Sequence, residues 1–473
     1  MNLRRVTLPL LIAVFLAGVP SSALAQGTTE AYFQFLMARR LEGQGDLKNA
    51  EAALERAVEA DGRSAEIRAE LAAFYLRRSQ PEEAEKAAKD ALAIDDRSLE
   101  AHRTLGLVYA GYTDSVTQRN PTPQVTEYLR QAIVHLERAA SSPTSGSDLI
   151  LNFTLGRLYL RNGTPENAIQ ALNRVLNQNP GSVQARLLLA RAQAGASDLK
   201  GAIETLDVIV DDEPRVAEAL AQYQEQAGLL KEAADTYTKA LTVQPTSKEL
   251  KFRRIAVLYN AKEFGRAASF AADARRQHPD DARFPRLQAR ALFDTGDRSA
   301  GIAVLEAAAK AFPKDTTTQY ALADLYKDAG RGGDAEKTLR QILEIEPTNA
   351  NALNYLGYLL ALRGEQLDEA IQLVRKALDA EPDNGAYLDS LGWAYFRRGD
   401  FGQAEKYLGA AADKLPRNSE IQDHLGDLHV RRGRFQDAIG AWTRALDGDG
   451  TDIDRAAIEK KISNARVKMQ NAK

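Results

Sequence analysis

The chain has 473 residues, several times the size of one hydrophobic core, so it holds several domains or a core that grows along one dimension. Its net charge of −3 argues against a general nucleic-acid binder, and a hydrophobic content of 44% permits extensive burial. Because cysteine is absent, disulfides, thiolate metal sites, thiol nucleophiles and lipid attachment at a cysteine after a signal sequence are excluded.

The N-terminus has the layout of a secretory signal peptide, residues 1–25. Arg4 and Arg5 precede an apolar run, 8–19, that is too short to span a membrane. A small-residue motif ending at Ala25 then provides a cleavage site, and an uncleaved anchor is the alternative. Cleavage would leave a net charge of −5 and no later stretch of membrane-spanning length, which predicts a soluble mature protein. The Ala- and Arg-rich composition favours a bacterial source and therefore the periplasm.

A small residue recurs about every 34 residues through the rest of the chain. These anchors are Ala50, Ala84, Ala132, Ala168, Ala202, Ala233, Ala267, Gly301, Ala335, Ala370, Ala404 and Ala438. Prolines that stop helices follow most anchors by twelve residues: Pro180, Pro214, Pro245, Pro279, Pro313, Pro347, Pro382 and Pro416. Small residues also precede most anchors by twelve, among them Gly156, Gly392 and Gly426, and Gly357 precedes its anchor by thirteen. The period predicts a repeat protein.

In the stretch 386–416 the pattern reads L-G-x-x-Y, then A-x-x-x-L, then P, and it resembles the tetratricopeptide repeat. The matching residues are Leu388, Leu391, Gly392, Tyr395, Ala404, Leu408, Ala411 and Pro416. The resemblance covers about residues 31–450. It implies an all-α fold, a right-handed α-α superhelix (solenoid) of about twelve 34-residue helix–turn–helix repeats plus a C-terminal capping helix.

Each repeat is predicted to be two antiparallel helices, A and B. Gly392 and Ala404 are small because the two helices cross closely at these positions. Gly399 can adopt the left-handed conformation that ends helix A. Asp400 can cap helix B, and Gln403 is placed for a reciprocal bond.

Irregular stretches divide the repeats. The polar segment 111–126 predicts an inserted loop in the third repeat, and 141–147 predicts a flexible joint. We therefore expect an N-terminal lobe, 26–147, that holds repeats one to three, and a second array, 148–450, that holds repeats four to twelve. Residues 451–473 are expected to form the capping helix.

The capping helix is predicted from an apolar stripe, Ile458, Ile462, Ala465 and Met469, which would cover the last repeat. The preceding segment DGDGTDID (447–454) lacks the Gly and Glu that an EF-hand calcium loop needs at positions six and twelve. A helix-capping turn is the better interpretation.

Nothing in the sequence predicts catalysis. The five histidines lack metal-ligand spacing, and there is no phosphate loop or nucleophile elbow. We therefore expect no enzymatic activity, no cofactor and no metal site; copurification of a metal or cofactor would revive the enzymatic alternative.

In the tetratricopeptide family, helix A lines the inner surface that binds partners. Carried over residue by residue, that surface predicts partner-binding positions at Arg253, Arg286, Arg290 (with Arg283 beside them), Asn354, Tyr358, Asp389, Trp393, Phe396, Asp423 and Asp427. The surface should change from basic in the middle to aromatic and acidic near the C-terminus. The alternative is that Tyr358 and Trp393 only pack between helices and that the arginines only solvate the surface.

The C-terminal third also resembles bacterial envelope repeat proteins that act as adaptors, one group of which tethers a carboxy-terminal-processing serine protease. The motifs that carry this resemblance are N-Y-L-G-Y, a lengthened L-D-E-A turn and Y-L-D-S-L-G-W. The resemblance implies a periplasmic scaffold that binds protein or peptide partners, such as a protease or envelope-assembly machinery. A scaffold for exopolysaccharide or pilus assembly is the alternative, and self-association stays open.

Overall fold

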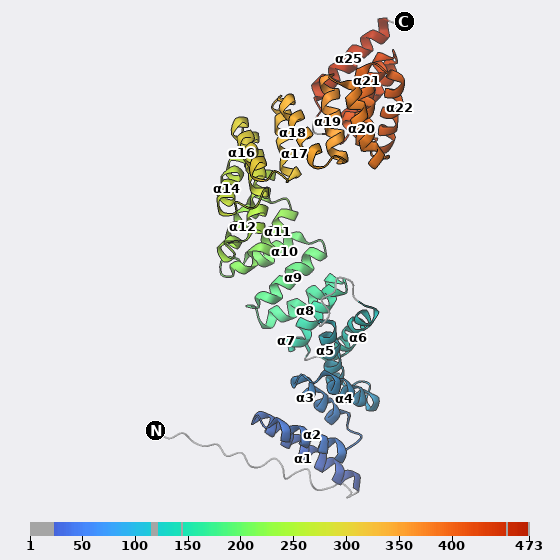
Figure 1. The fold of residues 1–473 in the computed structure, drawn as a ribbon. Helices are drawn as coiled ribbons and strands as arrows, with labels where there is room; N and C mark the ends of the chain where they lie inside the picture. The colour runs from blue at the N-terminus through green and yellow to red at the C-terminus, as the bar shows by residue number, and fades with distance from the viewer. Residues whose placement is uncertain (1–22, 115–121, 143–144, 451–452, 472–473) are drawn as a thin grey trace. The chain divides into compact units, whose positions relative to one another are not determined.

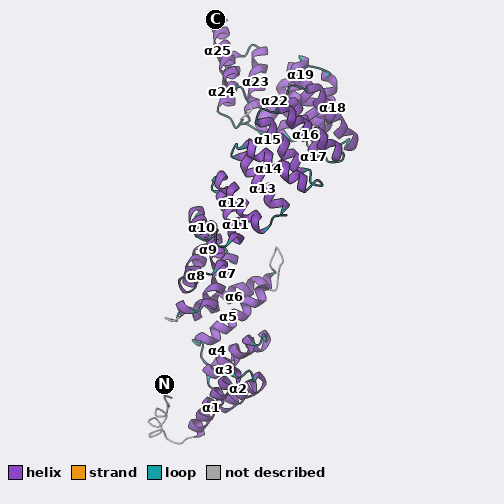
Figure 2. Ribbon diagram, turned by 90° about the vertical axis from the view of Figure 1, so that its left-hand side faces the viewer, coloured by secondary structure: helices purple, strands orange, loops and turns teal. Residues whose placement is uncertain are grey.

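The computed structural model describes residues 23–114, 122–142, 145–450 and 453–471. All regular structure in these ranges is helical (Figure 2). The predicted signal peptide lies outside the described residues up to position 22, and so does the centre of the predicted loop, 115–121.

The contacts divide the chain into two units, Met1–Gln244 and Pro245–Lys473, each a run of paired helices (Figure 1). The helices of unit 1 are α1 (Ala23–Gly43), α2 (Leu47–Ala60), α3 (Ala65–Arg77), α4 (Pro81–Ile94), α5 (Leu99–Asp114), α6 (Pro123–Ala139), α7 (Leu149–Arg161), α8 (Pro165–Gln178), α9 (Val183–Gly195), α10 (Leu199–Asp207), α11 (Ala217–Gln226) and α12 (Leu230–Val243), with 3-10 turns η1 (Ser145–Ser147) and η2 (Pro214–Val216).

Unit 2 continues the same alternation of A and B helices. Its helices are α13 (Lys248–Asn260), α14 (Phe264–Gln277), α15 (Arg283–Asp294), α16 (Arg298–Ala311), α17 (Thr316–Asp328), α18 (Gly332–Ile345), α19 (Ala350–Arg363), α20 (Leu367–Ala380), α21 (Gly385–Arg398), α22 (Phe401–Lys414), α23 (Ser419–Arg431), α24 (Phe435–Leu446) and α25 (Arg455–Asn471). The predicted repeats therefore correspond to twelve described hairpins and one further helix.

The close crossing predicted within each hairpin is confirmed. The anchor Ala404 is fully buried. A Cβ added to Gly392 on α21 would lie 2.7 Å from Cγ and 2.8 Å from the backbone nitrogen of Leu408 on α22. Gly357 meets Val374 in the same way, at 2.5 Å. The small residue of helix A thus packs against the residue four positions after the anchor, and there is no room for a larger side chain.

The turn between the two helices uses the predicted device with one correction. Gly399 is left-handed, with φ +87°, and the Asp400 carboxylate accepts the N–H of Gln403 at 3.2 Å. The predicted reciprocal hydrogen bond, from the Asp400 N–H to the Gln403 side chain, is wrong. The Asp400 N–H instead donates to the Tyr395 carbonyl at 2.9 Å. Other repeats place a residue with a side chain in this left-handed position: Ser79, Ser197 and Lys262.

Helix B ends two residues before the predicted proline in seven repeats. The helices α8, α12, α14, α16, α18, α20 and α22 all end in this way. The prediction is wrong for Pro214, because α10 already ends at Asp207 and the proline instead begins η2. Proline is favoured at the first position of a helical turn, where its missing N–H would have no partner.

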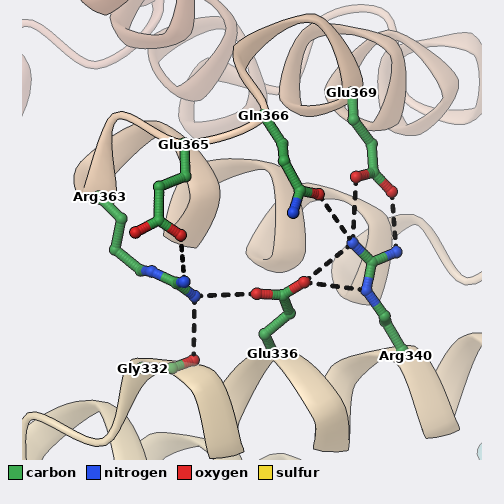
Figure 3. A network of polar contacts seen from close by, with 7 residues as sticks. All are labelled: Gly332, Glu336, Arg340, Arg363, Glu365, Gln366 and Glu369. Carbon is green, nitrogen blue, oxygen red and sulfur yellow. Dashed lines mark hydrogen bonds and ion pairs between the residues drawn. The ribbon is translucent and has the colours of Figure 1, made fainter.

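The lengthened turn between α19 and α20 is held by a polar network (Figure 3). Gln366 is left-handed, with φ +46°, and its side-chain oxygen accepts from Arg340 Nη2 at 3.3 Å. Arg340 also donates to Glu369 at 2.8 and 3.0 Å and to Glu336, and Glu336 accepts from Arg363 at 2.9 Å. The network ties α18 to both helices of the next repeat, so it offsets the strain of the extra turn residue.

The predicted boundary between lobes at 147/148 lies inside unit 1, and the contacts divide the chain at 244/245 instead. One core cluster continues across the predicted boundary and includes both Leu136 of α6 and Leu151 of α7. Arg103 of α5 also donates to Asp148, the N-cap of α7, at 2.6 Å. Helices occupy both ends of the predicted loop 111–126, since α5 ends at Asp114 and α6 begins at Pro123.

The C-terminal helix α25 covers the last hairpin as expected. Ile458, Ile462 and Ala465 are at most 8% exposed and pack against Ile439 and Trp442 of α24. The turn before α25 ends in a cap, because the Asp454 carboxylate accepts the N–H of Ala457 at 2.9 Å.

Candidate functional site

The predicted basic positions gather around one pocket of unit 2. The pocket has a volume of about 370 Å³ and opens on the A helices α13, α15 and α17. It is lined by Phe252, Arg283, Arg286, Leu287, Arg290, Leu305, Ala321, Asp324 and Leu325. Three of the four arginines predicted there therefore border one cavity, and Arg253 is not among its lining residues.

Each arginine of this pocket is held by a carboxylate. Arg286 Nη1 donates to Asp315 at 2.6 Å, and Arg290 Nη1 donates to Asp328 at 3.1 Å. Arg283 Nη2 donates to Asp281 at 2.8 Å. The arginines therefore form a rim in which each cation has a carboxylate partner. Arg286 and Arg290 pair with the next repeat, and Arg283 pairs with Asp281 two residues before it.

The electrostatic environment raises the pKa of two of these guanidinium groups, Arg283 and Arg290. Burial alone would lower the pKa of Arg290, but hydrogen bonds to the Tyr259 hydroxyl and the Asp294 carboxylate outweigh it and raise the pKa. The side chain of Arg283 also lies over the ring of Phe252, with 5.0 Å between the guanidinium carbon and the ring centre. The result is an apolar floor with a fixed, charged rim.

The predicted aromatic end is packed rather than exposed at Trp393. Its ring is only 9% exposed and stacks on His424 at 4.0 Å and on Phe396 at 4.8 Å. Trp393 and Phe396 lie on α21 and His424 lies on α23, so the stack joins adjacent A helices. Of the two interpretations of Trp393, the burial favours packing.

Asp389 is likewise buried, at 5% exposed, and binds His424 Nδ1 through both carboxylate oxygens at 3.0 and 3.1 Å. Burial by itself lowers the pKa of His424, but the charges of Asp389 and Glu420 outweigh burial and raise this pKa. The hydroxyl of Tyr358 on α19 donates to Glu420, and burial raises the Tyr358 pKa. His424, which sequence reasoning left without a role, is thus the centre of this cluster.

The predicted acidic end is neutralised by α25. Lys461 Nζ lies 2.8 Å from Asp423 and 2.9 Å from Asp427. Burial raises the pKa of Asp427 despite this ion pair. The residues Phe396, Asp427 and Lys461 border a pocket of about 320 Å³ beneath the capping helix. Asn354 differs from these residues, since its side-chain oxygen is buried without a hydrogen-bond partner among the described residues.

A second arginine-lined pocket lies in unit 1 and was not predicted; Asp114 also lines it and pairs with Arg157. It has a volume of about 300 Å³ and includes Arg157 and Arg161 of α7 and Arg191 of α9. Arg157 and Arg191 directly follow the small residues Gly156 and Ala190 of their A helices, which is the inward position that identified Arg290. Applying the same inward position to these two repeats would have predicted Arg157 and Arg191 from the sequence.

No group of three or more His, Cys, Asp or Glu in the described ranges has a geometry that could hold a metal ion. In the same ranges, every helix is too short or too polar to cross a membrane.

Comparison with protein-family models assigns the repeats to a known repeat family. One tetratricopeptide-repeat model matches residues 41–107, 159–223 and 292–357, and a second matches 390–453. Together the matches cover more than half of the chain.

Among curated proteins, the chain is similar to the TPR repeat-containing protein PA4667 of Pseudomonas aeruginosa. The two are 30% identical over 165 residues, which is 35% of this chain and 28% of that protein. The match therefore spans little more than a quarter of the relative's length.

Solved structures resemble the chain at low identity. The structure of Naa15/Naa10 bound to HypK-THB aligns with 17% identity and a TM-score of 0.44, over 88% of this chain and 68% of that one. A tetratricopeptide repeat protein from Parabacteroides merdae aligns with 13% identity and a TM-score of 0.38, over 67% of this chain and 98% of that one. The twelve hairpins and the family matches together show that the chain belongs to the tetratricopeptide-repeat family.

Proposed function

We propose that this protein is a periplasmic adaptor that binds a partner protein or peptide at the pocket on α13, α15 and α17. Tetratricopeptide repeats form scaffolds for protein–protein interaction, which makes a protein partner the expected ligand. The observation that carries the proposal is the pocket itself, an apolar floor of Phe252 and Leu287 beneath the arginine rim. Such a site suits an apolar side chain of a partner that is flanked by hydrogen-bond acceptors.

The fixed rim favours binding energetically. Arg286 and Arg290 are already ordered by Asp315 and Asp328, so little side-chain entropy remains to be lost when a partner docks. The partner's acceptors would share these guanidinium groups with the existing carboxylates, because each group has five N–H donors.

Residues 1–25 support the location, because they have the layout of a signal for export. The resemblance of the C-terminal third to envelope adaptors supports a protease or an envelope-assembly complex as the partner. The exopolysaccharide or pilus alternative fits the long repeat array equally well, and an exposed aromatic and acidic surface would have been its further support. Trp393 is buried and Lys461 pairs with Asp423, so this end of the chain does not favour that alternative over a protein partner.

Site-specific crosslinking in cells tests the proposal. A photoreactive residue at Leu287, inside the pocket, should give a crosslinked protein, whereas one at Ile150, which is 60% exposed on α7, should not. Arg286→Ala should reduce the Leu287 crosslink severalfold, and Arg276→Ala, which removes an exposed ion pair on α14, should leave it unchanged. Equal crosslinking from Leu287 and Ile150, or none from Leu287, would refute the pocket as the partner site.

A further inference from the structure

The first helix of the chain exposes an unusual group of large apolar side chains. Tyr32, Phe33 and Leu36 on α1 are 47%, 55% and 64% exposed. The opposite side of α1 is buried against its own hairpin, since Ala31 and Ala38 are at most 1% exposed. Helix α1 pairs with α2 in both views (Figures 1 and 2). The Tyr32 hydroxyl donates to Glu66 of α3 at 3.2 Å, so Phe33 and Leu36 are the large apolar side chains that this hairpin leaves uncovered.

The repeat period identifies what this side of the helix normally does. Phe33 stands 34 residues before Ile67 of α3, which is 2% exposed and packs against Ala31 and Ala57 of the preceding hairpin. Arg40 likewise stands 34 residues before Phe74, which is fully buried. The exposed side of α1 is therefore the surface by which one repeat stacks on the repeat before it, and among the described residues nothing is stacked there.

Two charges lie at the ends of this surface. Glu30 and Arg40 are ten residues apart, about 15 Å along a helix, and both are exposed. In the described residues Glu30 accepts one hydrogen bond, from Gln34 at 2.8 Å, and neither Glu30 nor Arg40 has an ion-pair partner. We define the α1 face as Glu30, Phe33, Leu36, Met37 and Arg40; Tyr32 is left out because its hydroxyl donates to Glu66 of α3 at 3.2 Å.

We propose that two copies of the protein pair through the α1 face as antiparallel helices, with Glu30 of each copy facing Arg40 of the other. The positions of Glu30 and Arg40 favour a second copy of the chain as the partner. A two-fold axis near Phe35 would form the Glu30–Arg40 pair once on each side of the axis, and it would place Phe33 of one copy against Met37 of the other. A parallel pairing would instead face like charges.

The other end of the chain argues against head-to-tail stacking. There α25 already covers the last hairpin, and its outer side carries Val467, which is 52% exposed, among the exposed charges of Lys460, Arg466 and Lys468. A surface with these charges is a poor partner for Phe33 and Leu36. The α1 face is therefore matched by a second α1 face, and the pairing is independent of the pocket proposed above. One helix face is small for an interface, so we expect a weak, concentration-dependent dimer.

Sedimentation equilibrium of the protein purified after export, with the same N-terminus in every variant, tests the pairing over a range of concentrations. The wild-type chain should sediment as a monomer–dimer equilibrium. Leu36→Asp should weaken dimerisation by at least about tenfold, because it places a charge twice in an apolar contact. Ile150→Asp, at a similarly exposed apolar position on α7, should leave dimerisation unchanged. Helical circular dichroism of each variant verifies folding.

A charge swap separates this pairing from nonspecific apolar association. Glu30→Arg alone should weaken the dimer, and Glu30→Arg combined with Arg40→Glu should restore it, because the reversed charges again face each other. A chain that stays monomeric at all concentrations, a Leu36→Asp variant that still dimerises, or a double variant that is not restored would overturn the proposal. Vesicle binding by α1 without dimerisation would overturn it in favour of a lipid surface.

Discussion

Two histidines in similar helical hairpins experience opposite electrostatic environments. Burial and the neighbouring imidazole of His102, whose Nδ1 lies 2.7 Å away, lower the pKa of His135 to about 4. His424 is more deeply buried, yet its net pKa is raised, because the Asp389 carboxylate binds its imidazole directly. A neighbouring imidazole, which can itself become positively charged, opposes protonation of a histidine, whereas a paired carboxylate favours it.

The pKa of His135 predicts how stability depends on pH. The unfolded chain binds a proton at this histidine near pH 6.5, whereas the folded chain binds it only near pH 4, so acidification through this range favours unfolding. Because His135 is half-buried, we expect a loss of roughly 1 kcal/mol between pH 7 and pH 5. Urea denaturation of the wild type and His135→Gln at both pH values measures it, since the variant should lack this share of the loss.

His424 supplies the contrasting case. Its raised pKa means that the folded chain holds the proton more tightly, so its contribution is full below about pH 6.5 and is lost as the pH rises through the raised pKa. The same denaturation series with His424→Gln should therefore lose stability at low pH relative to high pH. An identical pH profile for the two variants would contradict both assignments.

At the scale of the helix, the hairpins are defined by a contact between a small residue and a branched side chain. Leu136, Leu172 and Leu408 each lie within 3 Å of the Cβ that alanine would add to the glycine opposite. This contact sets the separation of helices A and B, so the same spacing recurs although the neighbouring residues differ.

Gly392→Ala tests the crossing. Its Cβ would meet both the side chain and the backbone of Leu408, so we expect a destabilisation of about 1–3 kcal/mol despite the better helix propensity of alanine. Gly409→Ala on the facing helix α22 is the matched control, because nothing lies within 4 Å of its Cβ. The control should be neutral or stabilising by up to about 1 kcal/mol. Equal effects of the two substitutions in thermal denaturation would show that the crossing tolerates a methyl group.

At the scale of the molecule, the division at 244/245 separates six repeats from six repeats and the capping helix. In unit 2 one core cluster runs from Ala289 to Ala441 and lies entirely within Pro245–Lys473. A repeat array is stabilised by contacts between neighbouring repeats, so a segment that keeps whole repeats and its cap should keep most of its stability.

This arrangement predicts that residues 245–473 fold alone, with the helix content per residue of the full chain and cooperative urea unfolding. A fragment that starts at Arg298 is the matched comparison, because it separates α16 from α15 and removes Ala289 and Phe293 from the core. It should be less stable in its first repeat and bind more of a dye that reports exposed apolar surface. Noncooperative unfolding of 245–473 would show that the division at 244/245 is not a folding boundary.

The sequence by itself determined the helix hairpins, their period and most of their ends. Ala404 at the crossing, Gly399 and Asp400 in the turn and Pro416 after the helix act through neighbours in the same hairpin, and each was confirmed. Such local rules can be read from residue type and spacing because they involve few alternatives.

Only the tertiary structure decided which groove residues are accessible. Trp393 is buried by His424 from the next repeat, and Lys461, 34 residues beyond Asp427, neutralises the predicted acidic end. Likewise, a continuous core through Leu151 crosses the predicted joint, and the contacts divide the chain at 244/245. These outcomes depend on how side chains from different repeats meet after stacking, and a 34-residue period specifies the order of the helices without specifying those contacts.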